Sequence, residues 1–290
     1  MIYLILSIVL ATGLFVIFKY FGIYKVDVLK AIVVNYIVAF IIGFASAEKS
    51  IGFVEIANQP WLFGAIFLGA LFVAIFFVMA MTAQINGVSV TSVAGKMSVV
   101  IPILFGVFLY NESVTFLKIA GIIIALVAVY LASVKDEKGA TKKAGLLFPI
   151  LLFFGSGIID TTLKYVQVNF VPKEEVAIFS GSLFGFAAFF GLIVLVIKTI
   201  KTIKKREAFG VKNIIAGIAL GIPNYYSIVF LIKALQTEGF ESSTLFTINN
   251  VGVVVVSTIV GLLLFKESFS TKNRIGVVLA IVGIILVTIA

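Results

Sequence analysis

Residues 61–110 read WLFGAIFLGALFVAIFFVMAMTAQINGVSVTSVAGKMSVVIPILFGVFLY, two apolar runs joined by the short segment Gln84 to Gly87. Each run has the length of roughly 20 residues that an α-helix needs to cross the hydrocarbon core of a bilayer. Because the connection is so short, the second run must return beside the first, as in a tight hairpin between antiparallel helices. The stretch therefore predicts two consecutive transmembrane helices.

The same pattern continues along the whole chain of 290 residues, of which 62% are hydrophobic and 12% are charged. Soluble globular domains are only about 45 to 50% apolar, so this composition excludes a water-soluble protein. The long unbroken runs are unlike the short alternating strands of an outer-membrane barrel. We expect an all-α integral membrane protein with ten transmembrane helices, over residues 2–19, 28–47, 61–83, 88–110, 115–134, 144–167, 175–197, 214–236, 240–265 and 274–290.

The chain contains no histidine and no cysteine, which excludes several kinds of chemistry. There can be no thiolate nucleophile, no imidazole base and no His- or Cys-ligated zinc, haem or iron–sulfur site. The net charge of +9 reflects lysines in loops, which set membrane topology, and does not require nucleic acid. There is also no Walker-type G-x-x-x-x-G-K-[ST] loop, so we expect neither an enzyme nor an ATP-driven pump, and no cofactor or metal.

Lysine and arginine are divided unevenly between the two sides that alternate connections would occupy. Most lie after the first, third, fifth, seventh and ninth runs, notably in 135–143 and 198–212. Because cytoplasmic loops are enriched in these residues, the distribution predicts that both termini lie outside the cytoplasm. Met1 to Phe21 has neither a basic n-region nor a cleavage site, so we expect it to be retained as the first span of a protein of the inner (cytoplasmic) membrane.

The two halves of the chain also match each other in order, with a slowly drifting offset. The corresponding pairs include Leu68 with Leu220, Gln84 with Gln236, Gly87 with Gly239, Gly121 with Gly276 and Ala125 with Ala280. They predict two five-helix repeats, residues 1–137 and 138–290. With an odd number of spans in each repeat, the second copy enters the membrane in the opposite sense. Such an inverted repeat underlies alternating access in many secondary transporters.

Each predicted half has an apolar run that ends in an acidic residue and is followed by a glycine-rich span. The two stretches are Phe108-Leu109-Tyr110-Asn111-Glu112 and Leu263-Leu264-Phe265-Lys266-Glu267. Together with the ten-span pattern and the short hairpins, they resemble the drug/metabolite transporter superfamily, EamA type, over the whole chain. The resemblance implies ten helices around a central cavity and a secondary carrier of small metabolites. The two glutamates are expected to form hydrogen bonds at helix boundaries rather than to contact substrate.

Polar side chains inside the predicted spans are the candidates for a substrate site, because a charged group at mid-span costs roughly 2.5 to 3.5 kcal/mol. Lys96 is too deep in its span to reach the interface, so it either binds a substrate carboxylate or phosphate, pairs with Asp160, or caps a carbonyl of a broken helix. For the carboxamides and tyrosines the alternative is packing between helices. These further candidates are Asn224, Tyr225 and Tyr226 beside Pro223, and Asn249 and Asn250.

Asp160 and Lys164 are one helical turn apart and share a face, so they either neutralise each other or leave Asp160 to couple transport to protons. The leading interpretation is a secondary active transporter that exports small polar metabolites such as amino acids by alternating access, as a monomer or a homodimer. The alternative is proton-coupled efflux of lipophilic cationic drugs through Asp160.

Overall fold

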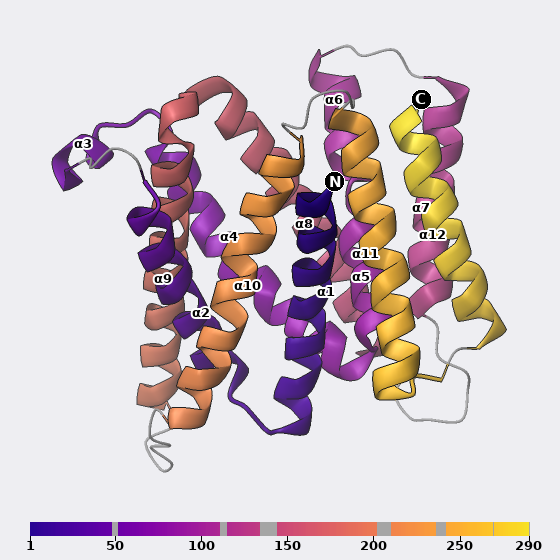
Figure 1. The fold of residues 1–290 in the computed structure, drawn as a ribbon, viewed down its shortest axis with the longest axis horizontal. Coiled ribbons are helices and arrows are strands. Elements are labelled where there is room, and N and C mark those ends of the chain that lie inside the picture. Colours follow the sequence, from indigo (N-terminus) through magenta and orange to yellow (C-terminus); the bar gives the residue numbers. More distant parts are fainter. Residues whose placement is uncertain are drawn as a thin grey trace. The chain divides into compact units, whose positions relative to one another are not determined.

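A computed structural model describes residues 1–47, 52–110, 115–133, 144–201, 210–235, 242–268 and 270–289. In these ranges the chain forms helices and no strand (Figure 1). The helices are α1 (Ile2–Ile23), α2 (Val28–Ala45), α3 (Phe53–Ala57), α4 (Leu62–Ile85), α5 (Val88–Met97), α6 (Val100–Tyr110), α7 (Phe116–Ser133), α8 (Ala144–Phe170), the 3-10 turn η1 (Lys173–Glu175), α9 (Val176–Lys201), α10 (Val211–Leu235), α11 (Ser242–Phe265) and α12 (Thr271–Ile289).

Each of the ten apolar runs predicted from the sequence contains helix in the structure. Among the described residues, eight helices are long and apolar enough to cross a membrane, and the apolar stretch of α7, Ile119–Ala132, is shorter. The all-helical prediction is therefore confirmed, and these helices indicate a multi-pass membrane protein. The number of ten spans and the inverted repeat stay predictions. Glu112, Gln236 and Gly239, on which part of the repeat depends, lie outside the described residues.

The chain divides into two compact units, each built from segments that are far apart in the sequence. The first unit contains Met1–Gly22, Val78–Ile158 and Tyr226–Ala290, and the second contains Ile23–Phe77 and Ile159–Tyr225. The boundary between the units therefore passes within α4, α8 and α10, and at the last residue of α1. Each unit draws on both predicted repeats, so the compact units do not coincide with the repeats, residues 1–137 and 138–290.

In the first unit, α7 and α12 pack together through small residues. A Cβ atom on Gly276 would lie only 2.4 Å from the backbone nitrogen of Ala132, and one on Gly283 would lie 3.4 Å from that of Ala125. Ala125 and Ala280 are completely buried. Small side chains let two backbones approach closely, and such packing drives helix association where lipid is as apolar as the protein.

In the second unit, α2 packs against α9, again through glycines. A Cβ atom on Gly43 would lie 3.0 Å from the Cα of Gly181, and one on Gly185 would lie 2.9 Å from the ring of Phe40. Gly181 and Gly185 are four residues apart and so lie on one face of α9. This spacing is typical of the close helix contacts found in membrane proteins.

Helix α2 also packs against α10. The face of α10 that contacts α2 contains residues spaced three or four apart, which are Asn213, Gly217, Gly221 and Asn224. A Cβ atom on Gly217 would lie 2.4 Å from a side chain of α2, and one on Gly221 would lie 2.8 Å from the carbonyl oxygen of Asn35. The two backbones are therefore in close contact between Asn213 and Asn224. This contact places both carboxamides against α2.

Candidate functional site at an interrupted helix

The fourth predicted span is interrupted in the structure, where Ser98 and Val99 separate α5 from α6. Pro102 has no N–H group and cannot bond to the carbonyl of Ser98, the residue four positions before it. The N–H of Ile101 donates to that carbonyl instead, at 2.9 Å. Ser98 keeps right-handed helical backbone angles, so the interruption is a tight turn, and such turns within a membrane-spanning segment occur where they are buried in protein or line a cavity. The interruption is therefore the first place to look for a site.

In the same unit, α5 packs against α11 through hydroxyl groups. The hydroxyl of Ser257 donates to that of Ser92. Further along the contact, a Cβ atom on Gly261 would lie 2.6 Å from the hydroxyl oxygen of Ser89. Residue numbers rise along α5 as they fall along α11, so the two helices are antiparallel, and each contact fixes their register.

This register brings three of the predicted site residues to the level of the interruption. Lys96 lies about 6 Å beyond Ser92 along α5, and Asn250 lies about 10 Å from Ser257 along α11, toward the same end. Asn249 and Asn250 are 1% and 3% exposed, and Lys96 is half-buried. Among the described residues, Asn249 Oδ1 has no hydrogen-bond partner. A buried polar atom of this kind calls for a bound water or ligand.

Helix α1 adds to this unit another buried polar atom for which the described residues offer no hydrogen-bond partner. The side chain of Ile8 lies against Gly252, where a Cβ atom would be 2.6 Å away, so α1 packs beside α11. Thr12, one turn after Ile8, is 3% exposed, and its hydroxyl oxygen has no hydrogen-bond partner within the described residues. Thr12 was not predicted as a site residue, because a lone threonine in an apolar run is not distinctive.

The groups near the interruption indicate which ligands it could bind. Lys96 is in the last turn of α5, where the helix dipole favours a cation. An ammonium group and carboxamides are suited to a carboxylate or a phosphate. In the described part of the chain, no three His, Cys, Asp or Glu side chains are grouped to hold a metal ion.

The start of α5 is held by a residue from the connection between α11 and α12. The Glu267 carboxylate accepts a hydrogen bond from the backbone N–H of Val88 at 2.7 Å and one from the hydroxyl of Ser89 at 3.0 Å. Gly87, the preceding residue, has a φ of 106° and has no room for a side chain beside this carboxylate. Glu267 therefore caps α5. The predicted hydrogen bonding of Glu267 at a helix boundary is confirmed.

Two other predicted site residues, Asn224 and Tyr225, lie in the second unit and are 3% and 6% exposed. Asn224 Nδ2 donates to Asn35 Oδ1 of α2 at 3.1 Å. The ring of Tyr225 lies 3.6 Å from the position that a Cβ atom on Gly43 would occupy. These contacts fit the alternative that the sequence left open, which is packing and hydrogen bonding between helices.

The carboxamide pair leads to a test of that structural role. Asn224→Leu removes the donor to Asn35 Oδ1 inside the protein and should lower the free energy of unfolding by about 1 kcal/mol, the range measured for such bonds in membranes. The double variant Asn35→Leu with Asn224→Leu should lose less than the sum of the two single variants, because no polar atom is left alone. Reversible unfolding in mixed micelles measures all three. Strictly additive losses would contradict the pairing.

The remaining predicted residues are exposed. Tyr226 is 38% exposed and stacks on Phe230, with ring centroids 5.9 Å apart. Asp160 and Lys164 lie one turn apart on α8, and both are exposed. Whether Asp160 pairs with Lys164 or couples transport to protons stays a prediction.

Comparison with known proteins finds a similar fold but does not identify a family. No family model matches the chain. The chain is 29% identical over 219 residues to a protein of Haemophilus influenzae described as "Uncharacterized protein", covering 75% of this chain and 72% of that protein. A solved structure described as "Crystal structure of protein" has a similar fold, with a TM-score of 0.61 at 17% identity over 99% of this chain and 96% of that chain. The resemblance to the drug/metabolite transporter superfamily stays a prediction.

Proposed function

We propose that this protein is a secondary active transporter that exports a small polar metabolite, with its substrate site at the interruption between α5 and α6. The observation that carries the proposal is the break at Ser98 and Val99, in a segment whose residues Val88–Phe105 otherwise qualify as a membrane span. In secondary transporters, discontinuous helices offer backbone groups near the bilayer midplane, and substrates bind there. Lys96 and Asn250 lie at the level of this break.

The packing of α7 against α12 supports the inverted repeat that this mechanism requires. Gly121 and Gly276 are equivalent in the predicted repeat, as are Ala125 and Ala280, and all four residues are buried. Two helices related by a two-fold axis would present equivalent small residues to each other. On this proposal the chain has ten spans and belongs to the drug/metabolite transporter superfamily. Alternating access would follow from exchanging the conformations of the two repeats.

The charge at the break suggests the class of substrate. Lys96 offers an ammonium group, and Asn249 and Asn250 offer carboxamides with both donors and acceptors. This combination suits a carboxylate or a phosphate, so amino acids are among the candidate substrates. The lysine-rich connections favour the inner (cytoplasmic) membrane, with both termini outside the cytoplasm.

The proposal is tested by ligand screening with a Lys96 variant. The detergent-purified protein is screened for thermal stabilisation by amino acids, sugars, nucleotides and quaternary amines, since a ligand that binds only the native state raises Tm. We expect a zwitterionic or anionic metabolite to stabilise the protein. Lys96→Met should weaken its binding at least about tenfold, because a hydrogen bond to a charged group contributes about 1.5 to 3 kcal/mol. Counterflow of that metabolite in proteoliposomes should fall in parallel.

The matched control is Lys272→Met, which removes the same charge from an exposed position at the start of α12. It should leave binding unchanged. If Lys96→Met binds the metabolite as tightly as the unaltered protein, the site is not at the break. Stabilisation by lipophilic cations alone, unaffected by Lys96→Met and lost in Asp160→Asn, would instead favour proton-coupled drug efflux.

A further inference from the structure

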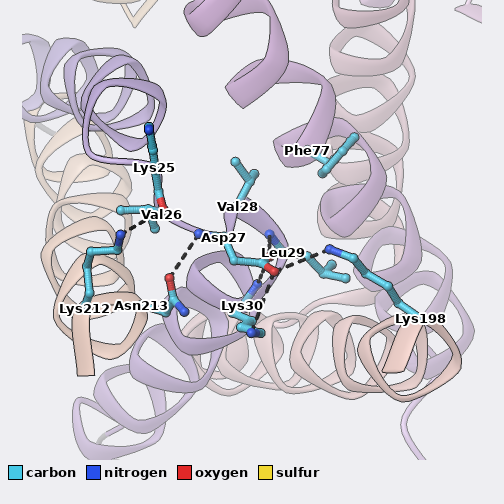
Figure 2. A pocket seen from close by; sticks show the side chains of 10 residues that line it. All are labelled: Lys25, Val26, Asp27, Val28, Leu29, Lys30, Phe77, Lys198, Lys212 and Asn213. Carbon is cyan, nitrogen blue, oxygen red and sulfur yellow. Dashed lines mark hydrogen bonds and ion pairs between the residues drawn. The ribbon is translucent and has the colours of Figure 1, made fainter. Parts of the chain in front are cut away.

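A second polar region lies in the other compact unit, where the connection before α2 meets the end of α9 and the start of α10. It is a pocket of about 610 Å³, within the range of about 300 to 1,000 Å³ that is typical of small-molecule sites. We name it the lysine pocket. Figure 2 shows the polar side chains that line it, which are Lys25, Asp27, Lys30, Lys198, Lys212 and Asn213.

The lining of the lysine pocket has four lysines against one aspartate, an excess of three positive charges. The Asp27 carboxylate is already shared, because it lies 3.4 Å from Lys198 Nζ and 3.9 Å from Lys30 Nζ. It also caps α2 by accepting a hydrogen bond from the backbone N–H of Leu29 at 3.1 Å. Among the described residues that line the pocket, one carboxylate therefore stands against four ammonium groups, and this excess of positive charge would favour a bound anion.

Hydrogen bonds hold the backbone and the side chains that surround these charges. Lys212 Nζ donates to the carbonyl oxygens of Tyr24 and Lys25 at 2.8 and 2.9 Å, as Figure 2 shows in part. Asn213 Oδ1 accepts a hydrogen bond from the backbone N–H of Asp27 at 3.0 Å. Lys25 itself has a φ of 51°, in the left-handed region that non-glycine residues rarely adopt.

Such a backbone conformation persists only when the surrounding contacts hold it, and it is found preferentially at binding sites. The side chain of Lys30 is only 10% exposed, whereas a lysine that serves membrane topology alone can extend into water. Lys25, Lys198 and Lys212 are exposed, so the lysine pocket differs from an ordinary cluster of surface lysines by the buried Lys30 and by the hydrogen bonds of Lys212 and Asn213.

We infer that the lysine pocket binds a phosphate group. Lysine ammonium groups bind phosphate as point charges, and the excess of positive charge favours a group that carries one or two negative charges. The distribution of lysine predicts that this end of the helices faces the cytoplasm, where basic pockets between membrane helices bind lipid headgroups. The phosphate could come from an anionic phospholipid or from a soluble phosphorylated compound. This inference does not depend on the proposed transport function.

The two sources are separated by measuring Tm with two probes. Inorganic phosphate is compared with chloride at equal ionic strength on the detergent-purified protein. Vesicles containing phosphatidylglycerol are compared with vesicles of phosphatidylcholine alone on the reconstituted protein. Stabilisation by inorganic phosphate supports the inference with a soluble ligand, and stabilisation by phosphatidylglycerol alone supports it with a lipid headgroup. If neither probe stabilises the protein, the inference is wrong.

Variants show whether the lysine pocket is responsible. Lys25→Gln and Lys198→Gln should each weaken binding of the effective probe about tenfold, as expected for loss of a hydrogen bond to a charged group. Lys198 is 58% exposed, so its replacement should not disturb folding, and Lys198→Arg should keep most of the binding because it keeps the charge. Lys272→Gln removes one charge outside the pocket and should have no effect. An equal loss in Lys272→Gln and Lys25→Gln would overturn the inference.

Discussion

Replacing Gly276 with alanine should lower the free energy of unfolding of the detergent-solubilised protein by about 2 to 3 kcal/mol, the upper part of the range for overpacked cores. The added Cβ atom would lie 2.4 Å from the backbone nitrogen of Ala132 and 2.9 Å from its Cα. Backbone atoms cannot rotate away as a side chain can, so α7 and α12 would have to separate. Reversible unfolding in mixed micelles measures the loss, and Tm should fall with it.

Two other glycines provide matched controls for this substitution. At Gly13 in α1 and Gly95 in α5, no heavy atom outside the adjacent backbone of the same helix lies within 4 Å of the position that a Cβ atom would occupy. Alanine at either position should keep or raise stability, because alanine is favoured over glycine in a helix by about 1 kcal/mol. If Gly276→Ala is as stable as Gly13→Ala, then α7 and α12 do not pack as described.

The second large effect is expected at Glu267. Glu267→Ala should lower the free energy of unfolding by about 2 to 3 kcal/mol, because it removes a helix cap and leaves the buried N–H of Val88 without its carboxylate acceptor. Gly87, at the N-cap position of α5, has no side chain to replace it. Glu267→Gln keeps one acceptor oxygen and should lose about half as much. The same unfolding measurement compares the variants.

Glu55→Ala is the control for the Glu267 variants. Glu55 is an exposed glutamate on α3, and its replacement should change stability by less than about 0.5 kcal/mol. Since α5 carries Lys96 in its last turn, Glu267→Ala should also weaken any ligand that depends on Lys96. Equal stability of Glu267→Ala and Glu55→Ala would show that the carboxylate does not cap α5.

The helices could be predicted closely because a membrane-spanning run is a local property of the chain. Their ends were predicted less well. Helix α1 continues to Ile23 and α9 to Lys201, each four residues beyond the predicted run. For α9 the reason is that hydropathy detects only the apolar part of a helix, whereas polar residues such as Lys198 and Lys201 continue the helix past it. The break at Ser98 and Val99 was considered only as one alternative for Lys96, and the span was predicted as a single run, although Pro102 leaves a carbonyl without its usual donor.

Parts of the candidate site were predictable and parts were not. Lys96, Asn249 and Asn250 stand out because polar groups are costly in hydrocarbon. The partners of polar residues could not be inferred, since Asn35 and Asn224 are 189 residues apart and Glu267 and Val88 are 179 apart. A single sequence does not show which of the many helix faces meet. The hydrogen bond of Asn224 to Asn35 of α2 could therefore not be foreseen, and the assignment of Asn224 to the substrate site stays a prediction.

By itself, the sequence determined that this protein is helical and crosses a membrane. Each apolar or charged residue favours lipid or water independently of the tertiary structure, so the runs and their connections can be located from the sequence alone. Only the tertiary structure decided which small residues meet, as Gly276 meets Ala132, and which distant groups share a pocket, as Lys25 and Lys198 do around Asp27. An apolar helix surface is solvated about equally well by lipid tails and by another apolar helix, so hydrophobicity does not select which helices pair. Pairing therefore depends on the close fit of small side chains and on a few hydrogen bonds, which exist only once the helices are assembled.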